Sequence, residues 1–146
     1  MNDDFVRNDS TVITASINDA GSADEYDILI NQTHTTTFTD DDSASIVIDP
    51  SGITTSGLTL LENSGTLSFN VQLGSQPVTD VVIDFTSNDT GEATVSSSSL
   101  TFTSSNWNVD QAMILTAVND DIDRDDSATL TISVNDAASD DTYDSI

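Results

Sequence analysis

Residues 67–73 read Leu67-Ser68-Phe69-Asn70-Val71-Gln72-Leu73, and apolar and polar side chains alternate along them without a break. Successive side chains of a β-strand point to opposite faces of its sheet, so this pattern predicts a strand with one buried and one solvated face. The same period recurs in several later segments, at 81–85, 100–102, 113–117 and 130–134. Two shorter apolar runs, 44–48 and 58–61, predict two earlier strands.

Turn-forming sequences separate these segments: Asp49-Pro50-Ser51-Gly52, Glu62-Asn63-Ser64-Gly65, Gly74-Ser75-Gln76-Pro77 and Ser87-Asn88-Asp89-Thr90-Gly91. No stretch has a convincing helical period. Many short strands joined by regular turns are typical of antiparallel sandwiches. We therefore predict an all-β protein, an antiparallel Greek-key β-sandwich.

The two ends of the chain repeat one another. Residues 2–29 align without a gap onto residues 119–146, with 15 of 28 positions identical at an offset of 117 residues. This period matches a small domain rather than a solenoid repeat of about 20–50 residues. We expect a segment of a tandem array: residues 1–42 hold the last two strands and the acidic linker of a preceding repeat, and residues 43–146 form a sandwich.

The N-terminal strands are expected around residues 13–17 and 33–39. The second copy stops before the counterpart of 33–39, so the sandwich is predicted to lack its own final strand. An open sheet edge invites strand addition. The spare N-terminal strand then fills the gap within the chain or between molecules, or the edge is simply frayed.

The charge balance is extreme. The chain has 26 acidic residues, two basic ones (Arg7 and Arg124) and a net charge of −24. Such a chain is expected to bind neither nucleic acid nor anionic membrane surfaces, because both carry negative charge; its natural partners are cations. Cysteine is absent, and no apolar run reaches the length of a membrane span. We expect an extracellular or cell-surface location, with the secretion signal outside these residues; a generic salt-adapted acidic surface is the alternative.

Acidic residues concentrate in the predicted loops, at Asp40-Asp41-Asp42, between Asp120 and Asp126, and at Glu62 and Asp89. Clustered carboxylates and loop carbonyls supply the six to eight oxygen ligands that calcium takes, whereas magnesium demands a stricter octahedron. Zinc is disfavoured because there is no cysteine and His34 is the single histidine. The alternative is that these acids are ordinary solvated turn residues.

Three short motifs occur in a characteristic order: Glu62-Asn63-Ser64-Gly65 before an alternating strand, Leu100-Thr101-Phe102-Thr103 before Asn106-Trp107, and Val118-Asn119-Asp120-Asp121 after the next strand. This order resembles the Calx-beta domain, an immunoglobulin-like, calcium-binding sandwich of sodium–calcium exchangers and large bacterial surface proteins. The likeness covers roughly residues 43–146, and the upstream fragment looks like the tail of another such domain.

The resemblance implies a set of calcium ligands: Glu62, Asp89, Asp120, Asp121, Asp125 and the triplet Asp40, Asp41 and Asp42. The family often has Glu where Asp125 stands, and the upstream copy has Asn8 there, so calcium binding is expected to be weaker than in the exchangers or to differ between copies. Arg7 and Arg124 superpose in the repeat; they either neutralise the acidic loop partly or form screened surface pairs.

Catalysis finds no support in the sequence. His34 lies in the fragment of the other copy, away from any candidate nucleophile, and the acids stand in polar turns rather than apolar pockets. We therefore expect a non-enzyme: a calcium-stabilised spacer repeat of a large surface or adhesin-type protein, whose partners are calcium and neighbouring repeats or copies of itself. The alternatives are a fibre subunit assembled head-to-tail by strand donation, and a carbohydrate- or protein-binding module. Trp107 is expected to plug the core or an edge.

Overall fold

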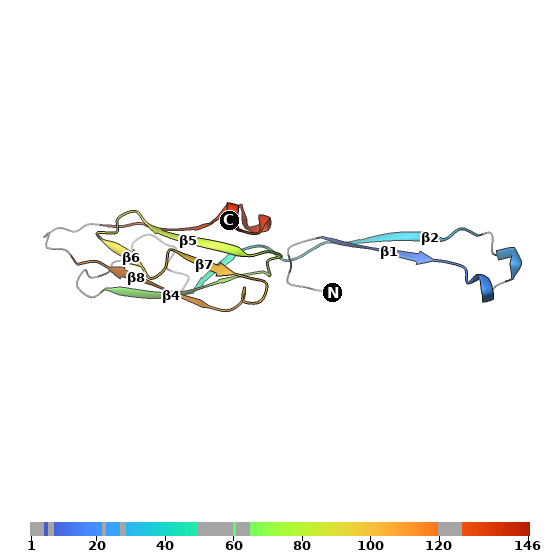
Figure 1. The fold of residues 1–146 in the computed structure, drawn as a ribbon, viewed down its shortest axis with the longest axis horizontal. Coiled ribbons are helices and arrows are strands. Elements are labelled where there is room, and N and C mark those ends of the chain that lie inside the picture. Colours follow the sequence, from blue (N-terminus) through green and yellow to red (C-terminus); the bar gives the residue numbers. More distant parts are fainter. Residues whose placement is uncertain are drawn as a thin grey trace. The chain divides into compact units, whose positions relative to one another are not determined.

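The computed structural model describes residues 5, 8–21, 23–26, 29–49, 60, 65–119 and 127–146. These residues fold into strands and short 3-10 helices, with no α-helix among them. They divide into two compact units, a hairpin unit of residues 8–41 and a sandwich unit of residues 42–146 together with Phe5 (Figure 1). Within the described ranges, no helix is long and apolar enough to cross a lipid bilayer.

The hairpin unit consists of two antiparallel strands, β1 (Asp9–Ala15) and β2 (Gln32–Phe38). Asp9 lies opposite Phe38 at one end of the register, and Ala15 lies opposite Gln32 at the other. The connection from β1 to β2 contains two 3-10 helices, η1 (Asp19–Gly21) and η2 (Asp24–Tyr26). The first strand begins at Asp9 and ends at Ala15, so it overlaps only the first three residues of the expected range 13–17.

The sandwich unit has two antiparallel sheets. The first has the strand order β3-β4-β8-β6, and its strands are β3 (Ile46–Asp49), β4 (Thr66–Leu73), β8 (Gln111–Ala117) and β6 (Ala93–Val95). The second has the order β7-β5-β9, and its strands are β7 (Ser99–Phe102), β5 (Val81–Ser87) and β9 (Leu130–Val134). In addition, Phe5 forms an isolated parallel bridge with Gln76.

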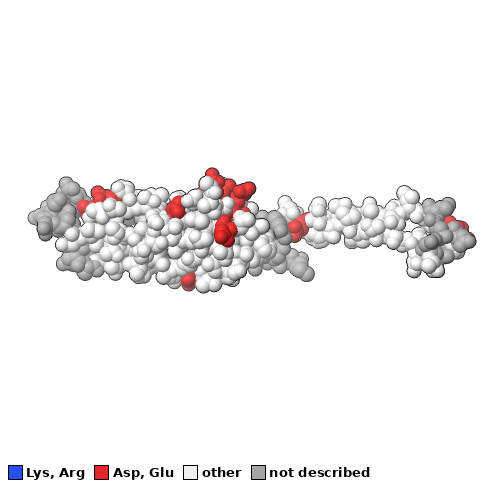
Figure 2. Space-filling model, viewed as in Figure 1, with Lys and Arg blue, Asp and Glu red and all other residues white. Residues whose placement is uncertain are grey.

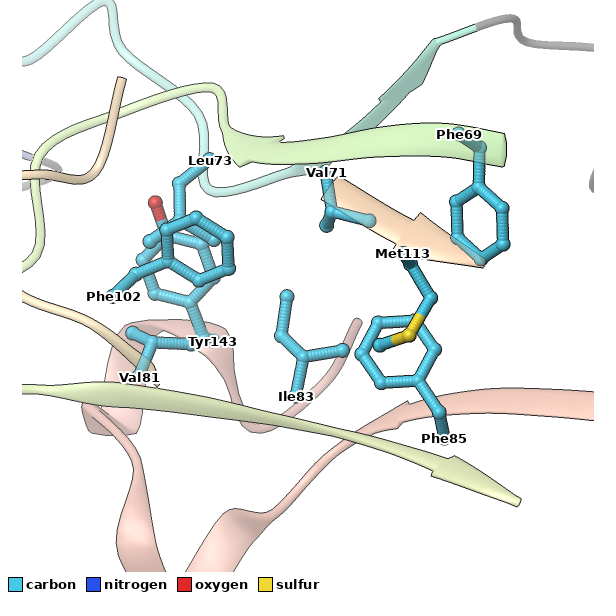
Figure 3. Packing of buried hydrophobic residues seen from close by; sticks show 9 residues of the cluster. All are labelled: Phe69, Val71, Leu73, Val81, Ile83, Phe85, Phe102, Met113 and Tyr143. Atoms are coloured by element: carbon cyan, nitrogen blue, oxygen red, sulfur yellow. The ribbon is translucent and has the colours of Figure 1, made fainter. Parts of the chain in front are cut away.

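The hydrophobic core lies between these sheets. Phe69, Val71 and Leu73 project from β4 toward the side chains of β5, as Figure 3 shows. The rings of Phe69 and Phe85 approach to a centroid distance of 6.2 Å. The remaining buried apolar side chains are Val81, Ile83, Phe102, Met113 and Tyr143. Each fully buried side chain of this size contributes about 1.5–3 kcal/mol through removal of apolar surface from water.

The predicted all-β, antiparallel sandwich is confirmed, and β4 follows the alternation of its sequence. Trp107 is half-buried and packs against the core. Strand β6 was not predicted. Of the expected strand 58–61 only Leu60 is described, and it lies outside any strand. The Greek-key arrangement stays a prediction, because residues 50–59, 61–64 and 120–126 lie outside the description.

The internal repeat extends to backbone geometry. Two 3-10 helices, η4 (Asp136–Ala138) and η5 (Asp141–Tyr143), follow β9 at the positions of η1 and η2 plus 117 residues. Their backbone hydrogen bonds match as well: Tyr26 N–H donates to Ala23 O over 2.9 Å, and Tyr143 N–H donates to Asp140 O over 2.9 Å. The same sequence element therefore adopts the same local fold in both units.

Candidate functional site

The acidic triplet Asp40-Asp41-Asp42 brings three carboxylates close together. One oxygen of each lies within 4.8 Å of the others, and no other set of three potential metal ligands is this close in the described part of the chain. Asp40 and Asp42 are half-buried, whereas Asp41 is exposed. Three converging carboxylate oxygens can supply part of the coordination shell of a hard divalent cation.

Asn8 lies beside this triplet. The backbone N–H of Asp40 donates a 2.8 Å hydrogen bond to Asn8 Oδ1. Asn8 occupies the place of Asp125 in the repeat, and the resemblance assigned that place and the acidic triplet to the same ligand set. Asn8 and Asp40 therefore lie together within the hairpin unit, and Asn8 has an amide oxygen where Asp125 of the second copy has a carboxylate.

Asp89 forms a turn of its own in the sandwich unit. Its Oδ1 accepts a 2.9 Å hydrogen bond from the Gly91 N–H, and its backbone carbonyl accepts bonds from the Ser87 hydroxyl and the Ala93 N–H. This is an Asx turn, in which an aspartate side chain replaces a backbone acceptor. Asp89 is exposed, so its carboxylate faces solvent as well as the turn.

Asn88 of the Asp89 turn and Glu92 just after it hydrogen-bond to the residues on either side of the acidic segment 120–126. Val118 N–H donates to Glu92 O over 2.8 Å, just before that segment. Just after it, Asn88 bonds with Thr129 twice: Asn88 N–H donates to Thr129 O over 3.1 Å, and Thr129 N–H donates to Asn88 Oδ1 over 2.6 Å.

The flank of the Glu62 turn is anchored close by. Gly65, the last residue of that turn, accepts a 2.9 Å hydrogen bond from the Ala117 N–H. Ala117 directly precedes Val118, whose N–H donates to the carbonyl of Glu92, the residue after the Asp89 turn. The described residues that flank three of the predicted acidic loops are therefore joined by hydrogen bonds at one end of the sandwich.

Several predicted ligands lie outside the described residues, namely Glu62, Asp120, Asp121 and Asp125, together with Arg7 and Arg124. Their roles stay predictions. Of the eight predicted ligands, the structure describes Asp40, Asp41, Asp42 and Asp89. It brings the first three together, and Asp89 is not a member of that group.

Asp140 is a buried, structurally important carboxylate that the sequence analysis missed. It is buried and accepts four hydrogen bonds: from Val78 N–H at 2.7 Å, Thr79 N–H at 2.9 Å, Thr142 N–H at 3.0 Å and Thr142 Oγ1–H at 2.7 Å. Burial raises the pKa of Asp140, but these hydrogen bonds lower it more, so the pKa lies below its ordinary value of 3.8. Its role is structural, because it joins η5 to the turn before β5. The spacing Asp140-x-Thr142, a capping pattern, is the signal that could have found it.

Acidic side chains also gather around the two C-terminal 3-10 helices, near the C-terminus in Figure 2. Loss of hydration raises the pKa of Asp144, and the hydrogen bond and negative charge of Asp136 raise it further, with smaller contributions from Asp141 and Asp140. These carboxylates repel one another at neutral pH. No described residue there carries a positive charge, since both arginines lie elsewhere in the sequence.

The hairpin unit has an open apolar hollow of about 240 Å³ lined by Ala15, Ser16, Ile17, Leu29, Ile30 and Gln32. The counterparts of Ala15 and Ile17 in the other copy are Ile132 and Val134, which pack against the sandwich core. Part of the lining of the hollow thus corresponds to a surface that the core covers in the sandwich unit. This origin makes it a poor candidate for a small-molecule site.

Fold and site together define a class, an all-β sandwich protein with a repeated C-terminal segment and acid-rich loops. Comparison with protein-family models, curated proteins and solved structures finds no significant match for this chain. The resemblance to Calx-beta domains therefore rests on the short sequence motifs alone and stays a prediction.

Proposed function

We propose that this chain is a structural repeat of a tandem β-sandwich array, serving as a calcium-stabilised spacer segment of a large extracellular surface or adhesin-type protein. The observation that carries this proposal is the repetition of η1 and η2 as η4 and η5 at an offset of 117 residues, with matching backbone hydrogen bonds. Domain-length repetition of this kind is typical of proteins that hold something at a distance.

Burial of the repeated tyrosine supports the same proposal. Tyr143 is fully buried in the sandwich core, whereas its counterpart Tyr26 is 52% exposed. Other apolar side chains of the hairpin unit are also exposed, among them Ile13 (61%). The repeated segment thus carries core-forming residues in both units, as expected if both copies derive from the same sandwich repeat.

The clustering of negatively charged side chains supports the calcium-binding part of the proposal. The triplet Asp40-Asp41-Asp42 gathers three carboxylates, and the described residues that flank the acidic loops of the sandwich hydrogen-bond near Asp89. At a net charge of −24, the acids of the folded chain repel one another. A bound divalent cation relieves that repulsion and stabilises the folded state by mass action, by about 2.7 kcal/mol at a hundredfold excess over Kd.

Thermal unfolding in EDTA, in millimolar calcium and in magnesium at the same ionic strength tests the calcium part. A rise in Tm that is specific to calcium supports it. The variant D40N/D41N/D42N should lose most of that rise. A charge-matched control, E25Q/D80N/D110N, changes three exposed acids outside the predicted ligand set and should keep it. An equal rise with either ion would show that the cations only screen charge, and would contradict a calcium site.

A ligand-binding role is the weaker alternative. It predicts an exposed aromatic patch, but in the sandwich unit Phe69, Phe85 and Phe102 are buried and Trp107 packs against the core. Among described residues, large aromatic exposure is confined to Tyr26 and Phe38 of the hairpin unit. The burial of aromatic side chains in the sandwich unit therefore favours a structural role over recognition of a sugar.

A further inference from the structure

The outer edge of β9 carries backbone groups that no described strand pairs with. β9 ends the sheet order β7-β5-β9. Asn135 N–H donates to Val82 O, and Asn88 N–H donates to Thr129 O, so the backbones of Thr129 and Asn135 face β5. In an antiparallel pair, residues whose backbone groups face the partner strand alternate with residues whose backbone groups face away from it. The N–H and C=O groups of Leu130, Ile132 and Val134 therefore point away from β5, to the open side.

The hairpin unit shows which strand belongs at this edge. β1 occupies the place of residues 126–132 in the repeat, and it is paired with β2. Observed partners are Ile13 with His34, Thr14 with Thr33, and Ala15 with Gln32. Adding 117 residues to the β1 positions places Leu130, Thr131 and Ile132 opposite His34, Thr33 and Gln32.

The pairing of β2 with β1 in the hairpin is weaker than a pairing of β2 with β9 would be. An isolated two-stranded sheet is marginally stable in water, and every residue of β1 is exposed. By contrast, the apolar side chains of β9 pack against a closed core. Charge does not oppose the exchange, because residues 28–39 and 127–135 contain no acid in a chain that has 26.

We propose that β2 of a second copy of this chain adds to the outer edge of β9, antiparallel and with His34 opposite Leu130. Copies of the chain are then linked by strand exchange, in which β2 leaves its own β1. The backbone hydrogen bonds supply the affinity, as in other cases of strand addition to a sheet edge. This inference rests on the same repeat as the proposed function, but it does not depend on calcium.

Disulfide trapping tests the register, because the native chain has no cysteine. Thr131 and Thr33 are exposed, and in the proposed pairing they form a non-hydrogen-bonded pair with Cα atoms about 4.5 Å apart, a separation that a disulfide bridges. Chains carrying T131C and T33C are mixed and oxidised, in EDTA and in calcium. A mixed disulfide dimer is expected, at several times the yield from T131C mixed with T35C, which is two residues out of register on the same face.

A second variant tests the exchange itself. The double variant T14C/T33C staples β2 to its own β1 when oxidised. Light scattering should show concentration-dependent association of the native chain, loss of association in the oxidised staple, and recovery after reduction. Equal trapping of T33C and T35C, a dominant T131C self-dimer, or a native chain that stays monomeric would each overturn the proposal. Trapping in EDTA alone supports it even where calcium fails to raise Tm, so the two proposals are tested separately.

Discussion

The hydroxyl of Tyr143 donates a 2.6 Å hydrogen bond to the backbone carbonyl of Ser75, 68 residues earlier in the chain. The hydroxyl of Ser75 completes the pair with a 2.8 Å contact to the Tyr143 oxygen, and both residues are buried. This contact fastens η5 to the turn after β4. Burial raises the pKa of Tyr143, so the phenol stays neutral and keeps its proton for Ser75.

Substitution of Tyr143 by phenylalanine should lower the free energy of unfolding by about 1–3 kcal/mol, because the buried polar atoms of Ser75 lose their partner. Urea unfolding measures this loss. The repeat provides a matched control: Tyr26→Phe removes the same hydroxyl from an exposed side chain and should change stability by less than about 0.5 kcal/mol. Equal losses in the two variants would contradict the role of the Tyr143 contact.

Asp140→Asn should cost about 1–3 kcal/mol at pH 7, because an amide cannot accept all the hydrogen bonds that the carboxylate accepts. The folded pKa of Asp140 lies below the unfolded value of 3.8, so its stabilising contribution is complete above that value. It is lost as the pH falls through the lower folded pKa.

Urea unfolding of wild type and Asp140→Asn across pH 7 to 2 checks this dependence, with the exposed Asp110→Asn as a control of equal charge. The stability difference should shrink in acid. A difference that is constant over this range would show that the carboxylate charge is not responsible.

Asp144→Asn should raise Tm at pH 7. The folded pKa of Asp144 lies above 3.8, so the ionised carboxylate destabilises the folded state once the pH exceeds both values. The gain from the variant should therefore fade as the pH falls toward 3.8. Thermal unfolding monitored by circular dichroism provides the measurement, and a gain that grows in acid would reverse the assigned sign.

Two substitutions of Asp89 separate its turn from its charge. Asn keeps the Oδ1 acceptor for Gly91 N–H, so Asp89→Asn should leave Tm in EDTA nearly unchanged while reducing the rise caused by calcium. Asp89→Ala removes the acceptor and should lower Tm in both conditions. If Asp89→Asn retains the full calcium effect, Asp89 is a turn residue only.

Strands were predicted correctly where apolar and polar side chains alternate over enough residues to indicate which face of the strand is buried. β4 has eight residues, and its inward side chains belong to the core. β6 was missed because Ala93–Val95 is too short to show a period; it becomes a strand by pairing with β8. Of the predicted ligands, consecutive Asp40, Asp41 and Asp42 were foreseeable as a group because neighbours in sequence stay near one another. The hydrogen bond between the Asn8 side chain and the Asp40 backbone could not be predicted in this way, because it depends on the pairing of β1 with β2.

The sequence by itself determined the all-β class, because side-chain alternation and turn formation depend on residues that are near neighbours in the chain. It also determined the 117-residue repeat, because the repeat is visible in the alignment of the two segments. The tertiary structure decided what each copy of the repeated segment does. Tyr26 and Tyr143 share the same local backbone, yet Tyr143 is buried and Tyr26 is half exposed. The difference arises because burial requires partners distant in sequence, and Ser75, Phe102 and the rest of the core surround Tyr143 alone.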